Sequence, residues 1–203
     1  MTHTVPVGSL DRLLETLDLR RPALAAHSRR VALHARQMGA ITGLPSDELA
    51  TIVQAALVHE AGALVGAGAR AATDLPGFEI WCGLSEDVAD VLWYSTRRFE
   101  HHRHAPLGAR LLAVAHAFDE LTTPREYHVP LSHESARMAI ARQAGRRYCP
   151  VAVNALMGCV VEGRAPGTET FVTAGPAPDA PVAGVALESA PRFTVNYRLV
   201  TTS

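Results

Sequence analysis

Histidine and glutamate interrupt the most apolar stretch of the sequence, ALVHEAGAL (residues 56–64), as the adjacent pair His59 and Glu60. An ionised carboxylate is costly to bury unless it is paired or bound to a metal ion. Adjacent residues of a helix point about 100° apart, so this pair needs ligands from other elements to hold an ion. The candidates are His27, in HSRRVALHARQMG, and His116, in LLAVAHAFDEL. Spacing alone leaves two interpretations open: metal ligands, or core histidines satisfied by hydrogen bonds.

Two further groups have side chains that could take part in chemistry. Asp119 follows His116 by three residues and could share its helix face. The run EHHRH (residues 100–104) is rich in ligand types, but it lies among charges between two predicted helices. It is either a solvated loop or a second metal-binding patch.

Apolar residues recur at helical spacing up to about residue 162, which predicts helices. These helices must position the candidate side chains. The third helix is apolar almost all round from Ile52 to Leu64, which favours a central position. The sequence predicts an all-α fold. The expected helices span residues 9–17, 21–43, 45–68, 84–99, 105–123, 132–145 and 149–163.

The composition changes at Gly163, where a stretch rich in glycine, alanine and proline begins. Such a stretch is typical of a linker. Near the end, RFTVNYRLV (residues 192–200) alternates apolar and polar residues like a strand. It could form a hairpin with ETFVT (residues 169–173) or add to another chain. We therefore predict a helical domain over residues 1–162 and a C-terminal extension over residues 163–203.

The bulk composition excludes several classes of protein. Of the 203 residues, 48% are hydrophobic and 19% charged, with a formal net charge of −1, so no basic surface for nucleic acid is expected. The basic residues are all arginine, which removes lysine from any mechanism. Three cysteines far apart in the sequence argue against a disulfide framework and favour the cytoplasm. We expect neither a signal peptide nor a membrane span, because no uncharged apolar run reaches roughly 18 residues.

Three stretches, taken in order, resemble the HD-domain superfamily and especially its HD-GYP branch of metal-dependent phosphohydrolases. They are HSRRVALHARQMG, then AALVHEAGAL, then PLGARLLAVAHAFDELTTPREYHVPLSHESARMAIARQAGRRYCPVAVNALM. The resemblance covers roughly residues 20–160 and implies an HD-domain helical bundle. The family's His-Asp motif is degenerate in this sequence, because a glutamate stands in place of its aspartate.

The family's ligand positions fall on His27, His59, Glu60 and His116 in this sequence. The resemblance therefore implies that these four side chains bind one divalent transition metal. Three imidazoles and a carboxylate suit zinc, iron, nickel or cobalt, and manganese is a further candidate. His116 stands at the position of a later aspartate, which binds metal in the family.

Other parts of the family pattern are missing. This sequence lacks the lysine after the His-Asp pair and the GYP signature. It also lacks the HHE that precedes GYP, so a second metal would need His101, His102 or His104. Without lysine, a substrate phosphate would have to be held by arginines of the same region. The expected phosphate anchors are Arg97, Arg98 and Arg103, and the expected general bases are Asp119 and His102.

Three functions are consistent with this pattern. The first is a divergent hydrolase that attacks a phosphoester or related small molecule with metal-activated water. The second is a catalytically inactive sensory or scaffold module that keeps the HD fold. The third is iron-dependent oxidation on the same fold. A homodimer could form through the alternating C-terminal strand, since an unpaired strand edge invites pairing.

Overall fold

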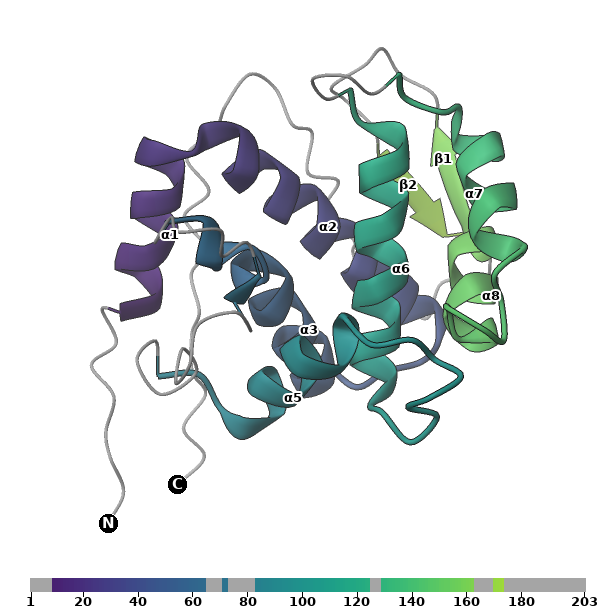
Figure 1. Cartoon of the computed structure of the whole chain (residues 1–203), viewed down its shortest axis with the longest axis horizontal. Helices are drawn as coiled ribbons and strands as arrows, with labels where there is room; N and C mark the ends of the chain where they lie inside the picture. The colour runs from purple at the N-terminus through teal and green to yellow at the C-terminus, as the bar shows by residue number, and fades with distance from the viewer. Residues whose placement is uncertain (1–8, 65–70, 73–82, 125–128, 163–169, 174–203) are drawn as a thin grey trace.

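The computed structural model describes residues 9–64, 71–72, 83–124, 129–162 and 170–173 (Figure 1). Helices make up most of this part of the chain, and the predicted all-α bundle is confirmed. They are α1 (Ser9–Arg20), α2 (Pro22–Ile41), α3 (Ser46–Val58), the short 3-10 helix η1 (Ala61–Leu64), α5 (Glu86–Ser95), α6 (Leu107–Thr122), α7 (His133–Ala141) and α8 (Pro150–Gly158).

Local sequence signals account for several helix ends. Pro22 opens α2, where its missing N–H costs no hydrogen bond. Ser85 caps α5 by accepting a hydrogen bond from the backbone N–H of Val88, and Ser132 caps α7 in the same way. Gly43, with φ of 76°, turns the chain after α2 in a conformation that favours glycine. These starts and stops agree with the expected ranges.

Four helices end earlier than predicted: α5 ends at Ser95 and α7 at Ala141, four residues early in each case, and the other two are replaced by different structure. The third was expected to reach residue 68, but α3 ends at Val58 and a 3-10 turn follows. The seventh was expected to reach residue 163, but α8 ends at Gly158. From there Cys159–Glu162 forms strand β1, which pairs antiparallel with β2 (Thr170–Thr173). Its paired valines favour extended backbone once a partner strand is present.

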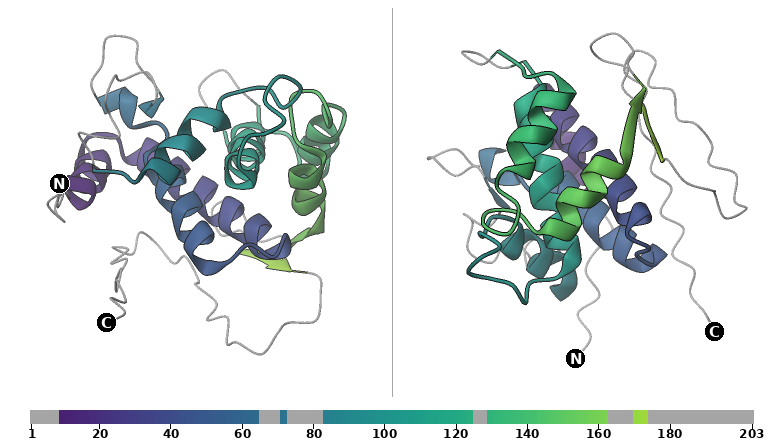
Figure 2. Two further views of the ribbon diagram at one scale, coloured as in Figure 1. Left: turned by 90° about the horizontal axis from the view of Figure 1, so that it is seen from below. Right: turned by 90° about the vertical axis from the view of Figure 1, so that its right-hand side faces the viewer.

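The hairpin of β1 and β2 lies against α2 at the end of α8 (Figure 2). Within the stretch ETFVT, Thr170–Thr173 forms a strand as expected, but its partner is the segment after α8. The expected strand over residues 192–200 lies outside the described residues. None of the helices in the described ranges has the length and apolar character that a bilayer crossing requires.

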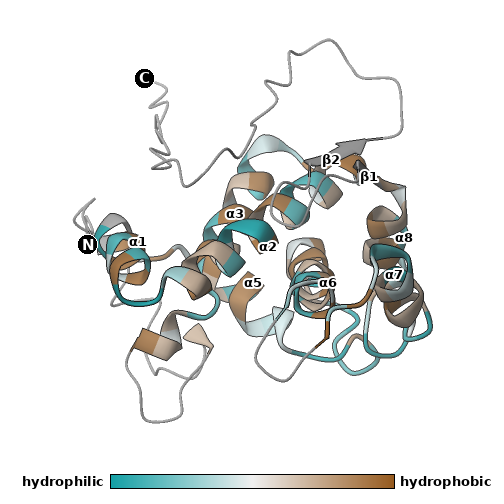
Figure 3. Ribbon diagram, turned by 90° about the horizontal axis from the view of Figure 1, so that it is seen from above, coloured by the Kyte–Doolittle hydropathy of each residue, from teal (hydrophilic) through white to brown (hydrophobic). Residues whose placement is uncertain are grey.

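Helix α6 is the centre of the bundle and contacts α2, α3, α5, α7 and α8. Figure 3 shows the apolar sides of these helices turned toward one another. The packing is close at Gly108, where an added Cβ would lie 2.7 Å from Cγ1 of Ile52. Partial exposure is confined to one stripe of α6 up to Glu120, with every intervening residue buried. The stripe consists of Leu107, Arg110, Ala113, His116 and Glu120.

Candidate metal centre

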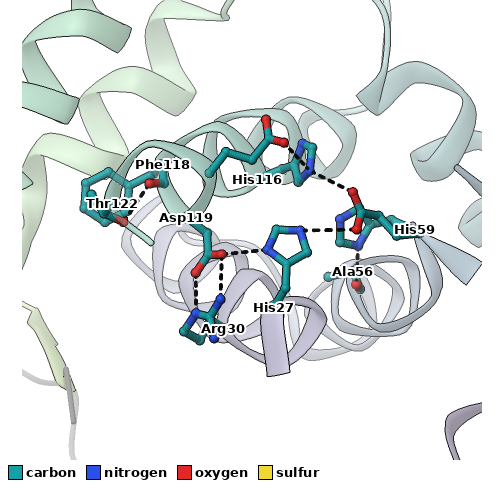
Figure 4. A network of polar contacts seen from close by, with 10 residues as sticks. His27, Arg30, Ala56, His59, His116, Phe118, Asp119 and Thr122 are labelled. Atoms are coloured by element: carbon teal, nitrogen blue, oxygen red, sulfur yellow. Dashed lines mark hydrogen bonds and ion pairs between the residues drawn. The ribbon is translucent and has the colours of Figure 1, made fainter. Parts of the chain in front are cut away.

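The four expected ligands come together where α2, α6 and the end of α3 meet (Figure 4). His27 comes from α2, His116 from α6, and His59 and Glu60 from the turn after α3. One nitrogen or oxygen atom from each side chain lies within 4.8 Å of the others. Residues that are distant in the sequence therefore converge on one point.

His59 and Glu60 lie directly after α3. The helix ends at Val58, and both residues belong to the turn that follows. Nδ1 of His59 contacts the carbonyl oxygen of Ala56 at 2.6 Å, which satisfies one of the helix-terminal carbonyls. The expectation of an unbroken helix here is wrong, since α3 ends just before the pair.

Hydrogen bonds fix the proton positions on two of the imidazoles. A carbonyl oxygen only accepts, so Nδ1 of His59 must donate to Ala56 and Nε2 carries a lone pair. Nδ1 of His27 lies 2.6 Å from Oδ2 of Asp119, and the ionised carboxylate also only accepts. Nδ1 of His27 therefore donates this bond, and in the neutral ring the lone pair is on Nε2.

The three Nε2 atoms of His27, His59 and His116 are buried and have no hydrogen-bond partner among the residues that the structure describes. Their rings lie close together, with centroids 4.9 to 5.2 Å apart. Glu60 faces two of them, with Oε2 at 3.9 Å from Nε2 of His27 and Oε1 at 3.6 Å from Nε2 of His116. Unpaired buried nitrogens are costly, so their convergence on one carboxylate needs an explanation.

Asp119 and Arg30 support this cluster from behind. The side chain of Asp119 is only 1% exposed and accepts from His27 and from Arg30, at 2.6 Å from Nε and 3.0 Å from Nη2. Burial alone would raise the pKa of Asp119, but the hydrogen bonds from His27 and Arg30 hold it well below its usual range. Asp119 thus stays ionised and keeps the ring of His27 in one orientation.

Arg30 was not among the residues expected from the sequence. A signal for it exists, since it follows His27 by three residues just as Asp119 follows His116. Residues three apart on a helix lie side by side. Each of these ligand histidines therefore has a charged neighbour on its own helix, and the two charged neighbours pair with each other.

The electrostatics keep the cluster ready to bind a cation. Burial, together with the neighbouring imidazoles of His116 and His27, lowers the pKa of His59 to about 3. Burial alone would raise the pKa of Glu60, but the imidazoles of His116 and His27 hold it below the usual value. Near neutral pH the site thus presents a carboxylate and an uncharged His59.

A divalent transition metal fits this arrangement. Zinc and similar ions take imidazole nitrogens and carboxylate oxygens at about 2.0–2.2 Å, often four at a time. An ion among the four side chains would satisfy the unpaired Nε2 atoms. Across the described ranges, these four residues are the one group of three or more such ligands close enough to hold an ion.

The other expected site residues lie elsewhere. Arg97, Arg98, His102 and Arg103 belong to the segment between α5 and α6, before the N-terminal end of α6. His116 follows Leu107 by nine residues, or about 14 Å of helix. The structure therefore does not place these four side chains among the ligands.

Each of the three arginines has an aromatic or acidic neighbour, either in α5 or in the segment that follows it. Arg97 stacks on Trp93 with its guanidinium carbon 4.0 Å from the ring centroid. Arg98 pairs with Glu100 at 2.6 Å, and Arg103 lies 5.6 Å from the ring centroid of Phe99. Arg98 is thus already neutralised, which weakens its assignment as a phosphate anchor.

Comparison with known proteins points to phosphodiesterases. No protein-family model matches the chain. A 52-residue stretch, 26% of this chain, is 38% identical to 12% of a protein from Vibrio cholerae serotype O1 named probable cyclic di-GMP phosphodiesterase. Another protein of that organism, named 3'3'-cGAMP-specific phosphodiesterase 2, is 25% identical over 174 residues, covering 71% of this chain and 33% of that protein.

This chain spans no more than about a third of the length of either relative. The similarity to the two phosphodiesterases is independent of the geometry of the cluster. Both observations lead to the same class of protein. Together with the cluster of three histidines and Glu60, the similarity supports an HD-like phosphohydrolase.

Proposed function

We propose that this chain is a metal-dependent phosphohydrolase domain that binds one divalent transition metal through His27, His59, Glu60 and His116. The observation that carries the proposal is the convergence of these four side chains, in which the three Nε2 atoms are buried and have no hydrogen-bond partner within the described ranges. A bound divalent ion would lower the pKa of a coordinated water toward neutrality and withdraw charge from a phosphoryl oxygen.

The site has a closed side and an open side. The side chains of His27 and Asp119 are 5% and 1% exposed, whereas those of His116 and Glu120 are 30% and 39% exposed. A substrate therefore reaches the cluster from the side of His116 and Glu120. On the closed side, Asp119 and the carbonyl of Ala56 orient the imidazoles and hold their Nδ1 protons.

We assign the role of proton acceptor to Glu120. Its Oε1 lies 3.7 Å from Nε2 of His116, on the open side of the cluster. Both oxygens of Asp119 are already occupied by His27 and Arg30. In the proposed mechanism Asp119 therefore acts as a positioning residue, and Glu120 takes the proton from the attacking water and returns it to the leaving group.

The proposed substrate is a phosphodiester. The names of the two relatives support this class, since both are called phosphodiesterases of cyclic nucleotides. The donor set alone does not choose between hydrolysis and iron-dependent oxidation, because iron also accepts histidine and carboxylate ligands. The two similarities favour hydrolysis.

The test begins with metal analysis of the purified protein and of metal-free protein reloaded with zinc, manganese or iron. We expect about one ion per chain and cleavage of bis(p-nitrophenyl) phosphate that depends on it. His59→Ala should lose the ion. Glu120→Gln should keep the ion but lower kcat by about 100-fold, as expected for loss of a general base.

Two outcomes would contradict the proposal. A protein that binds none of these metals would support the inactive scaffold instead. An iron-loaded protein that consumes oxygen and cleaves no phosphodiester would support oxidation.

A further inference from the structure

Helix α5 packs on α3 and α6 and presents its other side to solvent, where the charge changes sign along the helix. The exposed residues of α5 and of the turn after it include Glu86, Asp90, Trp93 and Arg97, spaced by four, three and four residues. This spacing places them along one side of the helix. The face therefore begins with two carboxylates, continues with an indole and ends with a guanidinium group.

Trp93 is the residue of this face whose position its own chain does not explain. It is 49% exposed, and the guanidinium group of Arg97 stacks on its ring. Its indole N–H has no acceptor among the residues that the structure describes. Tryptophan and arginine are the residue types most enriched at the energetic centres of protein interfaces. The stacked pair thus has the character of a surface that binds another protein.

The charges at the two ends of the face are also available to a partner. The ion pairs of the described residues involve neither Glu86, Asp90 nor Arg97, whereas the adjacent Arg98 pairs with Glu100. Acids near the start of a helix and a base after its end both suit the helix dipole. The dipole accounts for where the charges lie, but it leaves their hydrogen-bonding atoms without a partner in this part of the chain.

The face is complementary to itself when one copy is reversed. Four residues separate Glu86 from Asp90, and four also separate Trp93 from Arg97. Two antiparallel α5 helices that bring Glu86 opposite Arg97 of a second copy therefore also bring Asp90 opposite Trp93 of that copy. A two-fold axis makes each of these contacts occur twice. A carboxylate then meets a guanidinium group at both ends, and an indole N–H meets a carboxylate between them.

We propose that the exposed face of α5 binds the same face of a second copy of this chain, with the two helices antiparallel. Glu86 pairs with Arg97 of the other copy at each end, and Asp90 accepts a hydrogen bond from the indole of Trp93 near the two-fold axis. One helix face is small for a protein interface, and its ion pairs lie in solvent. The dimer is therefore weak and sensitive to salt, with a dissociation constant in the micromolar range.

The first arm of the test measures self-association of the whole chain by sedimentation velocity over a concentration series at low salt. We expect the dissociation constant of the dimer to rise about 100-fold in Arg97→Glu and in Glu86→Arg, because each change replaces two attractive contacts with two repulsive ones. Arg142→Glu is the matched control that should keep the wild-type constant, since Arg142 is exposed at the end of α7. Circular dichroism verifies the folding of each variant.

The second arm mixes Arg97→Glu with Glu86→Arg in equal amounts. Each variant repels its own copies, but the first carries carboxylates at both ends of the face and the second carries guanidinium groups at both ends. The mixture should therefore dimerise with about the wild-type constant, and raised salt should weaken it as it weakens the wild-type dimer.

Four results would overturn the interface. They are a wild type that stays monomeric at millimolar concentration, an Arg97→Glu protein that dimerises like wild type, a mixture that does not dimerise, and a loss of the dimer in Arg142→Glu equal to that in Arg97→Glu. The last result would assign the association to net charge in place of the α5 face.

Discussion

Replacing Asp119 with asparagine tests how the buried side of the cluster prepares the imidazole of His27. The carboxylate of Asp119 accepts from Nδ1 of His27 and from two nitrogens of Arg30. An asparagine has one acceptor oxygen, so it cannot serve both partners. If the oxygen faces Arg30, the amide NH2 faces His27 and favours the tautomer with the proton on Nε2, which blocks metal binding.

The expected loss is about 10- to 100-fold in metal affinity, the usual effect of removing a carboxylate behind a ligand histidine. That corresponds to about 1.4–2.8 kcal/mol of binding free energy. The contact is short, at 2.6 Å, and the side chains of His27 and Asp119 are 5% and 1% exposed, so solvent cannot replace it. The upper half of the range is therefore the better expectation.

The assay is a competition titration of metal-free protein with a chromogenic chelator, with circular dichroism to verify folding. Asp18→Asn is the matched control, because Asp18 pairs with Arg29 through both oxygens but its side chain is 45% exposed. Exposed pairs contribute about 0–1 kcal/mol, and this one lies outside the cluster. A folded Asp119→Asn protein with the metal affinity of wild type would refute the orienting role of Asp119.

Two further predictions concern the stability of the metal-free protein. Burial lowers the pKa of His34 to about 3, whereas the unfolded chain titrates near 6.5, so the free energy of unfolding should fall as the pH drops from 6.5 toward 3. His34→Leu should reduce that slope by up to about 1.4 kcal/mol per pH unit in urea titrations, and an unchanged slope would exclude His34 as a cause. Gly108→Ala should destabilise the protein by about 1–3 kcal/mol in thermal unfolding, because the new Cβ would meet Ile52 at 2.7 Å. Gly158→Ala, with its nearest contact at 3.6 Å, should stay within about 0.5 kcal/mol of wild type.

The convergence of the ligands could be predicted because each of them interrupts an apolar stretch. The resemblance to a family then assigned His27 and His116 to the same point as His59 and Glu60, and the structure brings all four together. The break after Val58 could not be predicted, since the residues around it are compatible with helix and neither proline nor glycine occurs between Ser46 and Ala61. The end of α3 depends on tertiary contacts that local propensity does not contain.

The chemical type of a residue was easier to predict than its role. Asp119 was expected as a general base, but its burial and its bond to Arg30 suit a positioning role that only the packed structure reveals. Arg97 was expected to hold phosphate at the metal, but its guanidinium group stacks on Trp93 outside the cluster of ligands. The strand after Gly158 was missed because its stability depends on a partner at residues 170–173.

The sequence separation of the ligands has a consequence for folding. His27 and His116 are almost 90 residues apart, so an ion held by both would act as a removable cross-link that closes a long loop. Such an ion would bind the native chain better than the unfolded one, and at 100 times its dissociation constant it would add about 2.7 kcal/mol to stability. The supply of metal would then govern how much of the protein survives proteolysis, in addition to how much of it is active.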